Sequence, residues 1–335
     1  MSKTNRRILF WGFFATFLVS APLLILYSAG YRLDLVNLRV YKTGLLVLQT
    51  NDRHIRTLFD GIPTRGLWRD DRLWFSQLLP GTISVRVEKT GFLPWEKEYR
   101  IEAGLTTFTS PVLLLRHRLP RKIAQGVYTF LPIKHLNDPV LLTQLNSKNE
   151  QKLWSFNSEE LTATTKQEYA RTIPPVKFEK TIEKLPKGQW DLLPSPKRFL
   201  TAIERTTRIL VVLDKERSTQ FSRGPIHDAR WNSNSLLAVL ENKQLHLWDV
   251  DAGTTQTTAL LVAAKYVAVP NRLPIVLLAD LQRVRALERT DANPFEVSLL
   301  ELKEIRDMRL VPDNKTLVVL GSDQDGPGVF LYDLP

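Results

Sequence analysis

The chain has 335 residues, which is more than one ordinary domain needs, and 43% of them are hydrophobic, which is enough to build packed cores. Its 46 lysines and arginines exceed its 35 aspartates and glutamates, but no run of five basic residues occurs, so the +11 charge indicates a solvated, mildly basic surface and no nucleic-acid site. The absence of cysteine excludes disulfides, thiolate metal sites, a cysteine nucleophile and a lipid-modified cysteine.

The first predicted element is an apolar helix at residues 8–29, which carry no charged side chain. About 20 apolar residues span the hydrocarbon core of a bilayer. Basic residues precede the run, at Lys3, Arg6 and Arg7. By the positive-inside rule, residues 1–7 form a cytoplasmic tail and the chain after residue 30 is extracytoplasmic. The sequence thus predicts a single-pass anchor in the cell membrane, with a cleaved signal peptide ending near residues 28–30 and a buried soluble helix as alternatives.

Residues 36–118 show short strands separated by turns. An apolar run at residues 44–49 precedes an Asp60-Gly61 turn, a pair that favours tight hairpins. A second turn, Leu79-Pro80-Gly81, leads into residues 83–87, where apolar and polar side chains alternate. Strands at this spacing predict a small β-sandwich.

The order of these turns resembles the PEGA domain, a small β-sandwich of bacterial surface and envelope proteins. The resemblance covers residues 40–116 and includes Lys89-Thr90-Gly91-Phe92 and Gly104. Where the family has its Pro-Glu-Gly-Ala signature, this chain has Asn51-Asp52-Arg53-His54. Because the family is non-catalytic, the resemblance implies a spacer or interaction module and no site residues.

Residues 121–335 contain a repeat in which a turn is followed by an apolar strand. The turns begin at residues 194, 232, 270 and 312, so they are 38, 38 and 42 residues apart. Two repeats then end in an aromatic residue and an aspartate, Trp248-Asp249 and Tyr332-Asp333. A period of about 40 is typical of propeller blades. The repeat resembles WD-repeat and TolB-type β-propellers, and the matching aspartates are expected to be structural.

An earlier, degenerate blade is predicted at residues 126–160, followed by a charged insertion at 161–186. This makes about five blades, with four as the alternative. The last repeat shows only three strands before Pro335. We therefore expect residues 122–129 to supply the fourth by pairing near Phe330, which would join the two ends of the ring.

No pattern of catalytic or metal-binding residues occurs. The histidines are not at a metal-ligand spacing; they are His54, His117, His135, His227 and His246. The Asp323-Gln324-Asp325-Gly326 segment lacks the glutamate of a calcium loop and predicts a hairpin turn. We predict no catalytic, cofactor-binding or metal-binding residue and no cofactor, while the binding residues stay unassigned.

These features predict a mostly β protein with an N-terminal transmembrane helix, a PEGA-like sandwich and a propeller. The expected function is a non-catalytic binding or scaffold protein of the bacterial cell envelope. Its expected partners are the membrane and an envelope protein or cell-wall polymer. One alternative is a propeller-based hydrolase or lyase, which converging acidic, His or Tyr side chains with perturbed pKa values would indicate. The other is a purely structural envelope protein.

Overall fold

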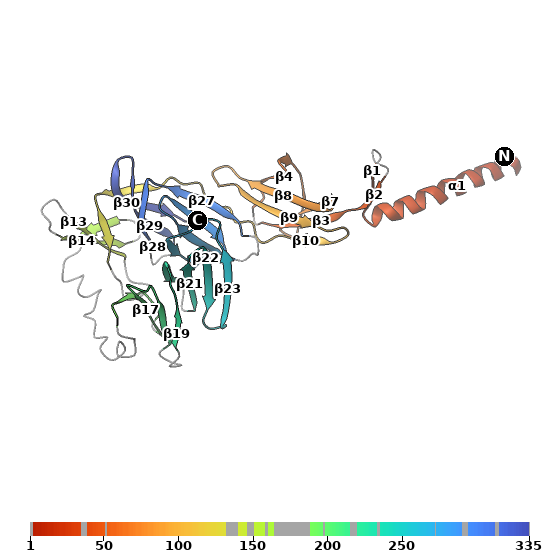
Figure 1. Ribbon diagram of the computed structural model, residues 1–335. Coiled ribbons are helices and arrows are strands. Elements are labelled where there is room, and N and C mark those ends of the chain that lie inside the picture. The colour runs from red at the N-terminus through yellow and green to blue at the C-terminus, as the bar shows by residue number, and fades with distance from the viewer. Residues whose placement is uncertain are drawn as a thin grey trace. The chain divides into compact units, whose positions relative to one another are not determined.

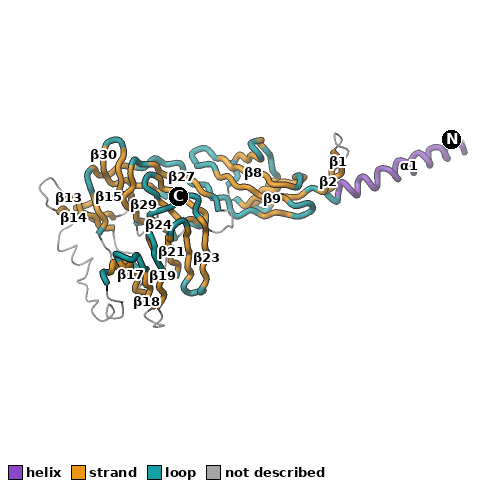
Figure 2. Tube along the Cα trace, in the orientation of Figure 1, coloured by secondary structure: helices purple, strands orange, loops and turns teal. Residues whose placement is uncertain are grey.

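The protein is described by a computed structural model that is mostly β (Figures 1 and 2). The described residues are 3–34, 39–50, 52–131, 140–145, 151–157, 160–163, 188–196, 198–214, 220–232, 235–271, 273–289, 294–311 and 315–334. The chain divides into two compact units, Met1–Leu115 and Arg116–Pro335. Of the predicted insertion at 161–186, all but the first three residues lie outside the described residues.

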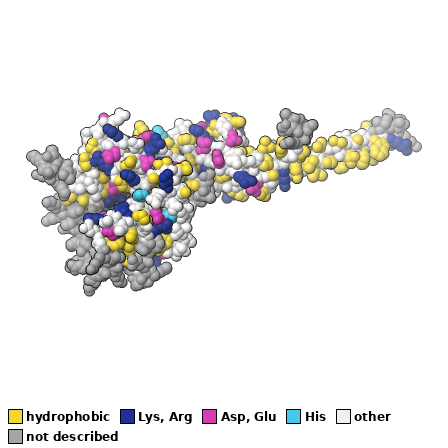
Figure 3. All heavy atoms as spheres, in the orientation of Figure 1, with side chains coloured by type: hydrophobic (Ala, Val, Ile, Leu, Met, Phe, Trp, Pro, Cys, Tyr) yellow, Lys and Arg dark blue, Asp and Glu magenta, His cyan; other side chains and the backbone are white. Residues whose placement is uncertain are grey.

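The first unit begins with the only helix of the described residues, α1 (Lys3–Ser28), which contains Pro22. Its segment Leu9–Ser28 is long and apolar enough to cross a membrane, as a membrane anchor or a signal sequence would be. Apolar side chains cover its visible surface (Figure 3). An isolated proline is tolerated in a membrane helix. The apolar helix is therefore confirmed, whereas its insertion and orientation stay predictions.

A short hairpin follows the helix. Strand β1 (Tyr31–Asp34) pairs with β2 (Arg39–Lys42) in antiparallel register. The carbonyl of Gly30 accepts hydrogen bonds from the amide of Thr43, at 2.9 Å, and from its hydroxyl, at 2.8 Å. The hairpin thus returns the chain to the end of the helix before the next strand begins.

The rest of the first unit forms two four-stranded sheets, as expected of a small sandwich, while its resemblance to the PEGA domain stays a prediction. One has the order β10-β3-β7-β6, with strands Thr106–Phe108, Gly44–Gln49, Arg72–Leu78 and Leu67–Arg69. The other has the order β5-β4-β8-β9, with strands Ile62–Pro63, Arg56–Phe59, Gly81–Glu88 and Trp95–Ile101. The rings of Phe59 and Phe75, one from each sheet, lie 4.5 Å apart in the shared core. The predicted Asp60-Gly61 turn is present, with φ of 50° and 79°.

The described part of the second unit forms five four-stranded antiparallel sheets. The sheet β12-β13-β14-β15 has strands Tyr128–Phe130, Val140–Leu145, Gln151–Asn157 and Glu160–Ala163. The sheet β16-β17-β18-β19 has strands Trp190–Leu193, Phe199–Glu204, Leu210–Asp214 and Gln220–Arg223. The sheet β20-β21-β22-β23 has strands Asp228–Trp231, Leu236–Glu241, Gln244–Asp249 and Thr254–Ala259.

The fourth sheet, β24-β25-β26-β27, has strands Tyr266–Ala268, Ile275–Ala279, Arg283–Glu288 and Glu296–Glu301. The fifth sheet, β11-β30-β29-β28, combines two distant segments, with strands Arg121–Gln125, Gly326–Asp333, Thr316–Asp323 and Glu304–Leu310. We call it the closing sheet. The strands β20, β24 and β28, each at one edge of its sheet, contact one another in turn.

Successive sheets of this unit pack face to face. Apolar residues of β12–β14 share a core with those of β29–β30, and the other cores join β17–β18 to β20–β21 and β21–β22 to β24–β26. Consecutive sheets that cover each other in this way form the WD-repeat-like arrangement of a β-propeller. A central strand of each sheet is buried on both faces, so no sheet would be stable without its neighbours.

The predicted closure is confirmed, because Lys122 pairs with Phe330 in antiparallel register. The range was too long, since Tyr128 and Thr129 belong to β12 of the next sheet. The predicted strands within 126–160 are present, but residues 160–163 extend that sheet by a fourth strand instead of opening the insertion. The predicted hairpin at Asp323–Gly326 is also present.

Candidate functional site

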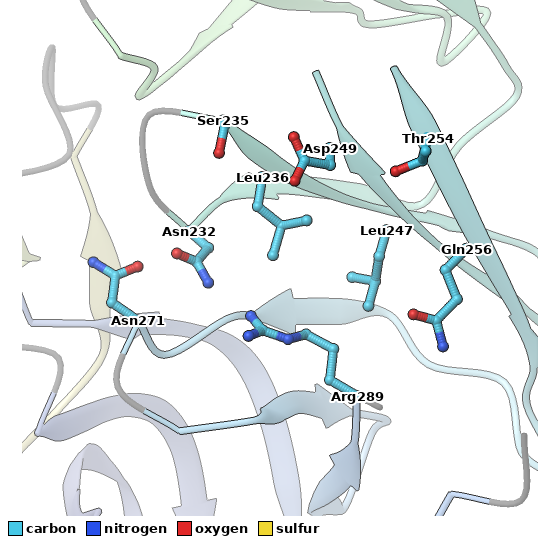
Figure 4. A pocket seen from close by; sticks show the side chains of 9 residues that line it. All are labelled: Asn232, Ser235, Leu236, Leu247, Asp249, Thr254, Gln256, Asn271 and Arg289. Atoms are coloured by element: carbon cyan, nitrogen blue, oxygen red, sulfur yellow. The ribbon is translucent and has the colours of Figure 1, made fainter. Parts of the chain in front are cut away.

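A cavity of about 630 Å³ lies between the sheet β20–β23 and the sheet β24–β27 (Figure 4). It is lined by Asn232, Ser235, Leu236, Leu247, Asp249, Thr254, Gln256, Asn271 and Arg289. A volume of this size is typical of ligand pockets. The lining combines two leucines with seven polar or charged side chains, so the cavity suits a polar ligand.

The turns at one end of the two sheets build this cavity. They connect β20 to β21, β22 to β23 and β24 to β25. The side-chain amide of Asn232 donates to the carbonyl of Pro270 at 3.4 Å and so links the two sheets. One carboxylate oxygen of Asp249 accepts the amides of Asp251 and Ala252, each at 3.1 Å, and so fixes its own turn. The predicted structural role of Asp249 thus agrees with its contacts, although its side chain also lines the cavity.

Arg289 follows β26 and extends into the cavity beneath Leu236 (Figure 4). Burial lowers the pKa of its guanidinium below the ordinary value. The structure shows no ion pair between Arg289 and any residue that it describes. A partly desolvated cation without a counter-ion is unfavourable, and a guanidinium binds carboxylate or phosphate through two parallel hydrogen bonds. Arg289 is therefore the cavity side chain with the chemistry to bind an anionic group.

A second polar cluster lies on the edge strands β20, β24 and β28, and we call it the inner charge cluster. It consists of Asp228, Arg230, Tyr266, Asp307 and Arg309. The Nε of Arg230 lies 3.4 Å from the carboxylate of Asp228, and its Nη2 lies 3.8 Å from that of Asp307. Burial raises the pKa of Asp228, and burial also raises the pKa of Tyr266.

The inner charge cluster bonds to backbone groups of neighbouring sheets. Asp228 accepts the amide of Val267, on β24, at 3.1 Å. Arg309 donates to the carbonyl of Leu131, next to β12, at 2.7 Å and lies over the ring of Phe130. Burial, and then the charge of Arg230, lower the pKa of Arg309 to about 10. The edge of a sheet leaves backbone groups unpaired, and these side chains satisfy some of them.

The inner charge cluster has the acidic and tyrosine side chains with raised pKa values that would mark an enzyme. Its two carboxylates, however, are balanced by arginines, and ion-pair networks that only stabilise a fold also perturb pKa values. Within the described residues, no group of three or more His, Asp or Glu side chains could hold a metal ion. The bonds of Asp228 to Val267 and of Arg309 to Leu131 join neighbouring sheets, and this geometry favours a brace between sheets.

The structure places the other predicted residues apart from both sites. His54, His117 and His227 are exposed, and His135 lies outside the described residues. His246 is buried, with Nδ1 2.9 Å from the hydroxyl of Thr257 and Nε2 2.8 Å from Arg223. Burial, followed by the charge of Arg223, lowers its pKa.

Asp333 has the structural contacts expected of the aspartate that ends a repeat. It lies 3.2 Å from Arg118 and accepts the hydroxyl of Thr316 at 3.4 Å.

One pattern in the sequence indicates the inner charge cluster. Asp228-Ala229-Arg230 and Asp307-Met308-Arg309 repeat an Asp-x-Arg pattern before corresponding turns. Residues two apart on a strand share a face, so this repeat indicates converging charges. No comparable pattern marks Arg289, because the cavity depends on how two sheets meet.

Comparison with known proteins adds little to this description. No protein-family model and no curated protein matches the chain. Among solved structures, it is similar to a chain of the mitotic checkpoint complex, with 10% identity, a TM-score of 0.38, and 76% of this chain and 73% of that chain covered. It is also similar to Kluyveromyces lactis Hsv2, with 12% identity, a TM-score of 0.35, and coverage of 64% and 61%. The chain thus spans less than two thirds of Hsv2. At these TM-scores the fold assignment rests on the strand pairing above.

Proposed function

We propose that this protein is a non-catalytic binding protein of the bacterial cell envelope, anchored by residues 8–29 with its body on the outer side. In this proposal, residues 36–118 form a PEGA-like spacer. Residues 121–335 form a five-bladed, WD-repeat-like propeller that binds a segment of another envelope protein in the cavity between the sheets β20–β23 and β24–β27.

Arg289 is the observation that carries the proposal. Its guanidinium is half-buried in the cavity, and its pKa is lowered by burial. A carboxylate of a partner would neutralise it in a site of reduced solvation, where such a pair is stronger than in water. The neighbouring amides of Asn232, Asn271 and Gln256 can bond the backbone of the same segment. A protein segment that carries an aspartate or glutamate side chain fits these groups.

The test is a pull-down with the full chain in detergent against envelope extract and, separately, isolated cell-wall polymer, at low and moderate salt. The variant is Arg289→Gln. Arg283→Gln is the control, because Arg283 lies at the other end of the same strand, is exposed and pairs with Glu301. We expect a protein partner that survives moderate salt, with capture reduced about tenfold by Arg289→Gln, as loss of a charged hydrogen bond predicts, and unchanged by Arg283→Gln.

Three results would contradict this function. If Arg289→Gln and Arg283→Gln capture the partner equally well, the cavity is not the binding site. Capture of polymer instead of protein, with the same dependence on Arg289, would identify the other expected class of partner. Binding that disappears with salt in all three proteins would mean that the +11 charge acts nonspecifically.

A propeller-based hydrolase or lyase is the second candidate, favoured by the raised pKa values of Asp228 and Tyr266. Turnover of cell-wall polymer fragments by the purified chain, abolished by Asp228→Asn in protein that stays folded, would support it. If Asp228→Asn alters only thermal stability, the inner charge cluster is a brace.

A further inference from the structure

The strand register places three chain segments at one end of the sandwich. Gly44 pairs with Leu78, and Gly81 pairs with Ile101, so the turns that follow Leu78 and Ile101 lie at the same end. The amide of Gly104 donates to the carbonyl of Thr43 at 3.0 Å. We call this the helix-proximal end, because Thr43 is itself bonded to Gly30, two residues after the helix ends.

The helix-proximal end exposes large apolar side chains. Leu79 is 60% exposed, Leu105 is 57% exposed, and Val40 of the hairpin is 57% exposed. The opposite end of the sandwich is charged, since Arg53 pairs with Asp71 there, and Lys89 pairs with Asp52. Ile62, Leu67 and Phe108 are also exposed, but they lie singly along the sheets. Leu79, Leu105 and Val40 instead lie together at the end that adjoins the apolar helix, and a group of exposed apolar side chains beside such a helix indicates a surface that is covered in use.

Aromatic and basic side chains surround these apolar residues. Arg32 lies over the ring of Tyr27, with its carbon 3.8 Å from the ring centre, and donates to the carbonyls of Tyr27 and Tyr31. Lys42 is exposed, and its side chain lies beside Gly104. Tyrosine, arginine and lysine with an apolar stem and a polar tip are typical of the water–lipid interface.

In the described residues, the end of the helix is bonded directly to the start of the sandwich. Gly30 has a φ of +86°, and its carbonyl accepts both bonds from Thr43. A helix that spans a bilayer ends in the headgroup layer. The strand that starts at Gly44 therefore starts in that layer, together with the turns that carry Leu79 and Leu105.

We propose that the helix-proximal end of the sandwich is seated in the headgroup layer of the outer leaflet, with Val40, Leu79 and Leu105 inserted and Arg32 and Lys42 beside lipid phosphates. The proposal rests on membrane anchoring by residues 8–29. It gives the sandwich a defined position against the lipid, which a spacer on a flexible tether would lack.

Spin labels can test this in the full chain, because it contains no cysteine and each introduced one is unique. Single variants Leu79→Cys, Leu105→Cys, Leu67→Cys and Phe14→Cys are labelled and placed in vesicles of phosphatidylethanolamine and phosphatidylglycerol. Collision rates with oxygen and with a water-soluble nickel chelate report the depth of each label. Leu67 is the matched reference, because it is 71% exposed but lies on the edge strand β6, paired with Trp74 and away from the helix-proximal end.

We expect the labels at 79 and 105 to collide severalfold more often with oxygen than with nickel, and the label at 67 to show the reverse. If the label at 14 is in lipid but the labels at 79 and 105 have the same collision rates as the label at 67, the seating is overturned. If the label at 14 is in water, the anchoring itself fails, and the seating fails with it.

The basic residues are tested by the double variant Arg32→Gln, Lys42→Gln in the Leu105→Cys background. With both cations present, the label should lie deeper in vesicles with phosphatidylglycerol than in vesicles of phosphatidylcholine alone. The double variant should lose this difference, and an unchanged difference would overturn the phosphate contacts.

Discussion

Two sheets of the second unit reach the same four-stranded form by different routes. The sheet β20–β23 comes from one continuous segment, residues 228–259, in which each strand pairs with the strand before it. The closing sheet pairs residues 121–125 with residues 326–333, and the contact between Lys122 and Asp323 joins positions 201 residues apart. Pairing across such a distance forms late and loses more loop entropy than a hairpin does.

Specific contacts compensate for this distance. The Nζ of Lys122 donates to Asp323 at 2.8 Å and to the carbonyl of Gly326 at 3.1 Å, and Gly126 donates to Pro327 at 2.9 Å. The sheet β20–β23 depends mainly on apolar packing of strands such as β21 against the neighbouring sheets. A propeller thus needs generic burial within each sheet and specific bonds where its ends meet.

The largest expected effect concerns the cores of the sheet β20–β23 and of the closing sheet. Leu240, in β21, and Leu320, in β29, are both buried, at 0% and 2% exposed. Leu240→Ala and Leu320→Ala should each lower the free energy of unfolding by about 3 kcal/mol, because both leave a cavity. Urea denaturation of the full chain measures this. If the ring unfolds as one unit, both variants show one transition for this unit, with the same dependence of the free energy of unfolding on urea concentration. A separate transition at lower urea for Leu320→Ala would mean that the closing sheet unfolds by itself.

A smaller effect is expected from Gly328→Val, which acts on the closure only. A Cβ at Gly328 would lie 2.5 Å from the carbonyl oxygen of Ala124, so β11 must move away from β30. The expected cost is about 2 kcal/mol, as for other overpacked sites. Hydrogen exchange should show loss of protection in residues 121–125, while β20–β23 keep theirs.

Ala259→Val, at the exposed end of the outer strand β23, is the control for this variant, because it adds a branched side chain at an exposed position. Protection of residues 121–125 that survives in Gly328→Val would contradict the closure by β11.

The smallest effect is expected from Asp323→Asn. The hydrogen bond from Lys122 lowers the pKa of Asp323 below its ordinary value of 3.8. A carboxylate with a lower pKa in the folded state stabilises the fold above its ordinary pKa, and this is lost as the pH falls through the folded value. Asp323→Asn should therefore have a lower Tm than the native protein at neutral pH and the same Tm in strong acid.

Asp325→Asn is the matched control, because it removes the same charge two residues away from an exposed side chain. If both variants lower the Tm equally at neutral pH, the loss reflects net charge and not the contact with Lys122.

Local patterns were sufficient to predict the central strands of the repeats and several strands of the sandwich. Turn residues at regular intervals, such as Asp60-Gly61, determine where strands end, and the repeat near residues 194, 232, 270 and 312 indicates one structural unit several times. The closure near Lys122 was predictable because the last repeat lacked a partner strand. Strand β15 was not, since Glu160–Ala163 becomes a strand only by pairing with β14.

The sites were harder to predict than the strands. The inner charge cluster has a trace in the repeated Asp-x-Arg pattern, but its contacts with Val267 and Leu131 depend on which sheets are neighbours. The cavity at Arg289 has no trace, because its walls come from turns whose spacing is set by packing. Periodicity encodes the sheets themselves, whereas sites between sheets arise from their assembly.

The segment that leads into the closing sheet has a mechanical consequence. The carbonyl of Arg116 accepts the hydroxyl of Tyr332 at 3.1 Å, and Arg118 pairs with Asp333, so this segment is tied to β30 even before β11 begins. Tension transmitted along the chain from Leu115 is therefore borne first by β30, the partner strand at the joint of the ring. The pairing of β11 with β30, which closes the ring, is therefore also the contact that resists force applied along the chain.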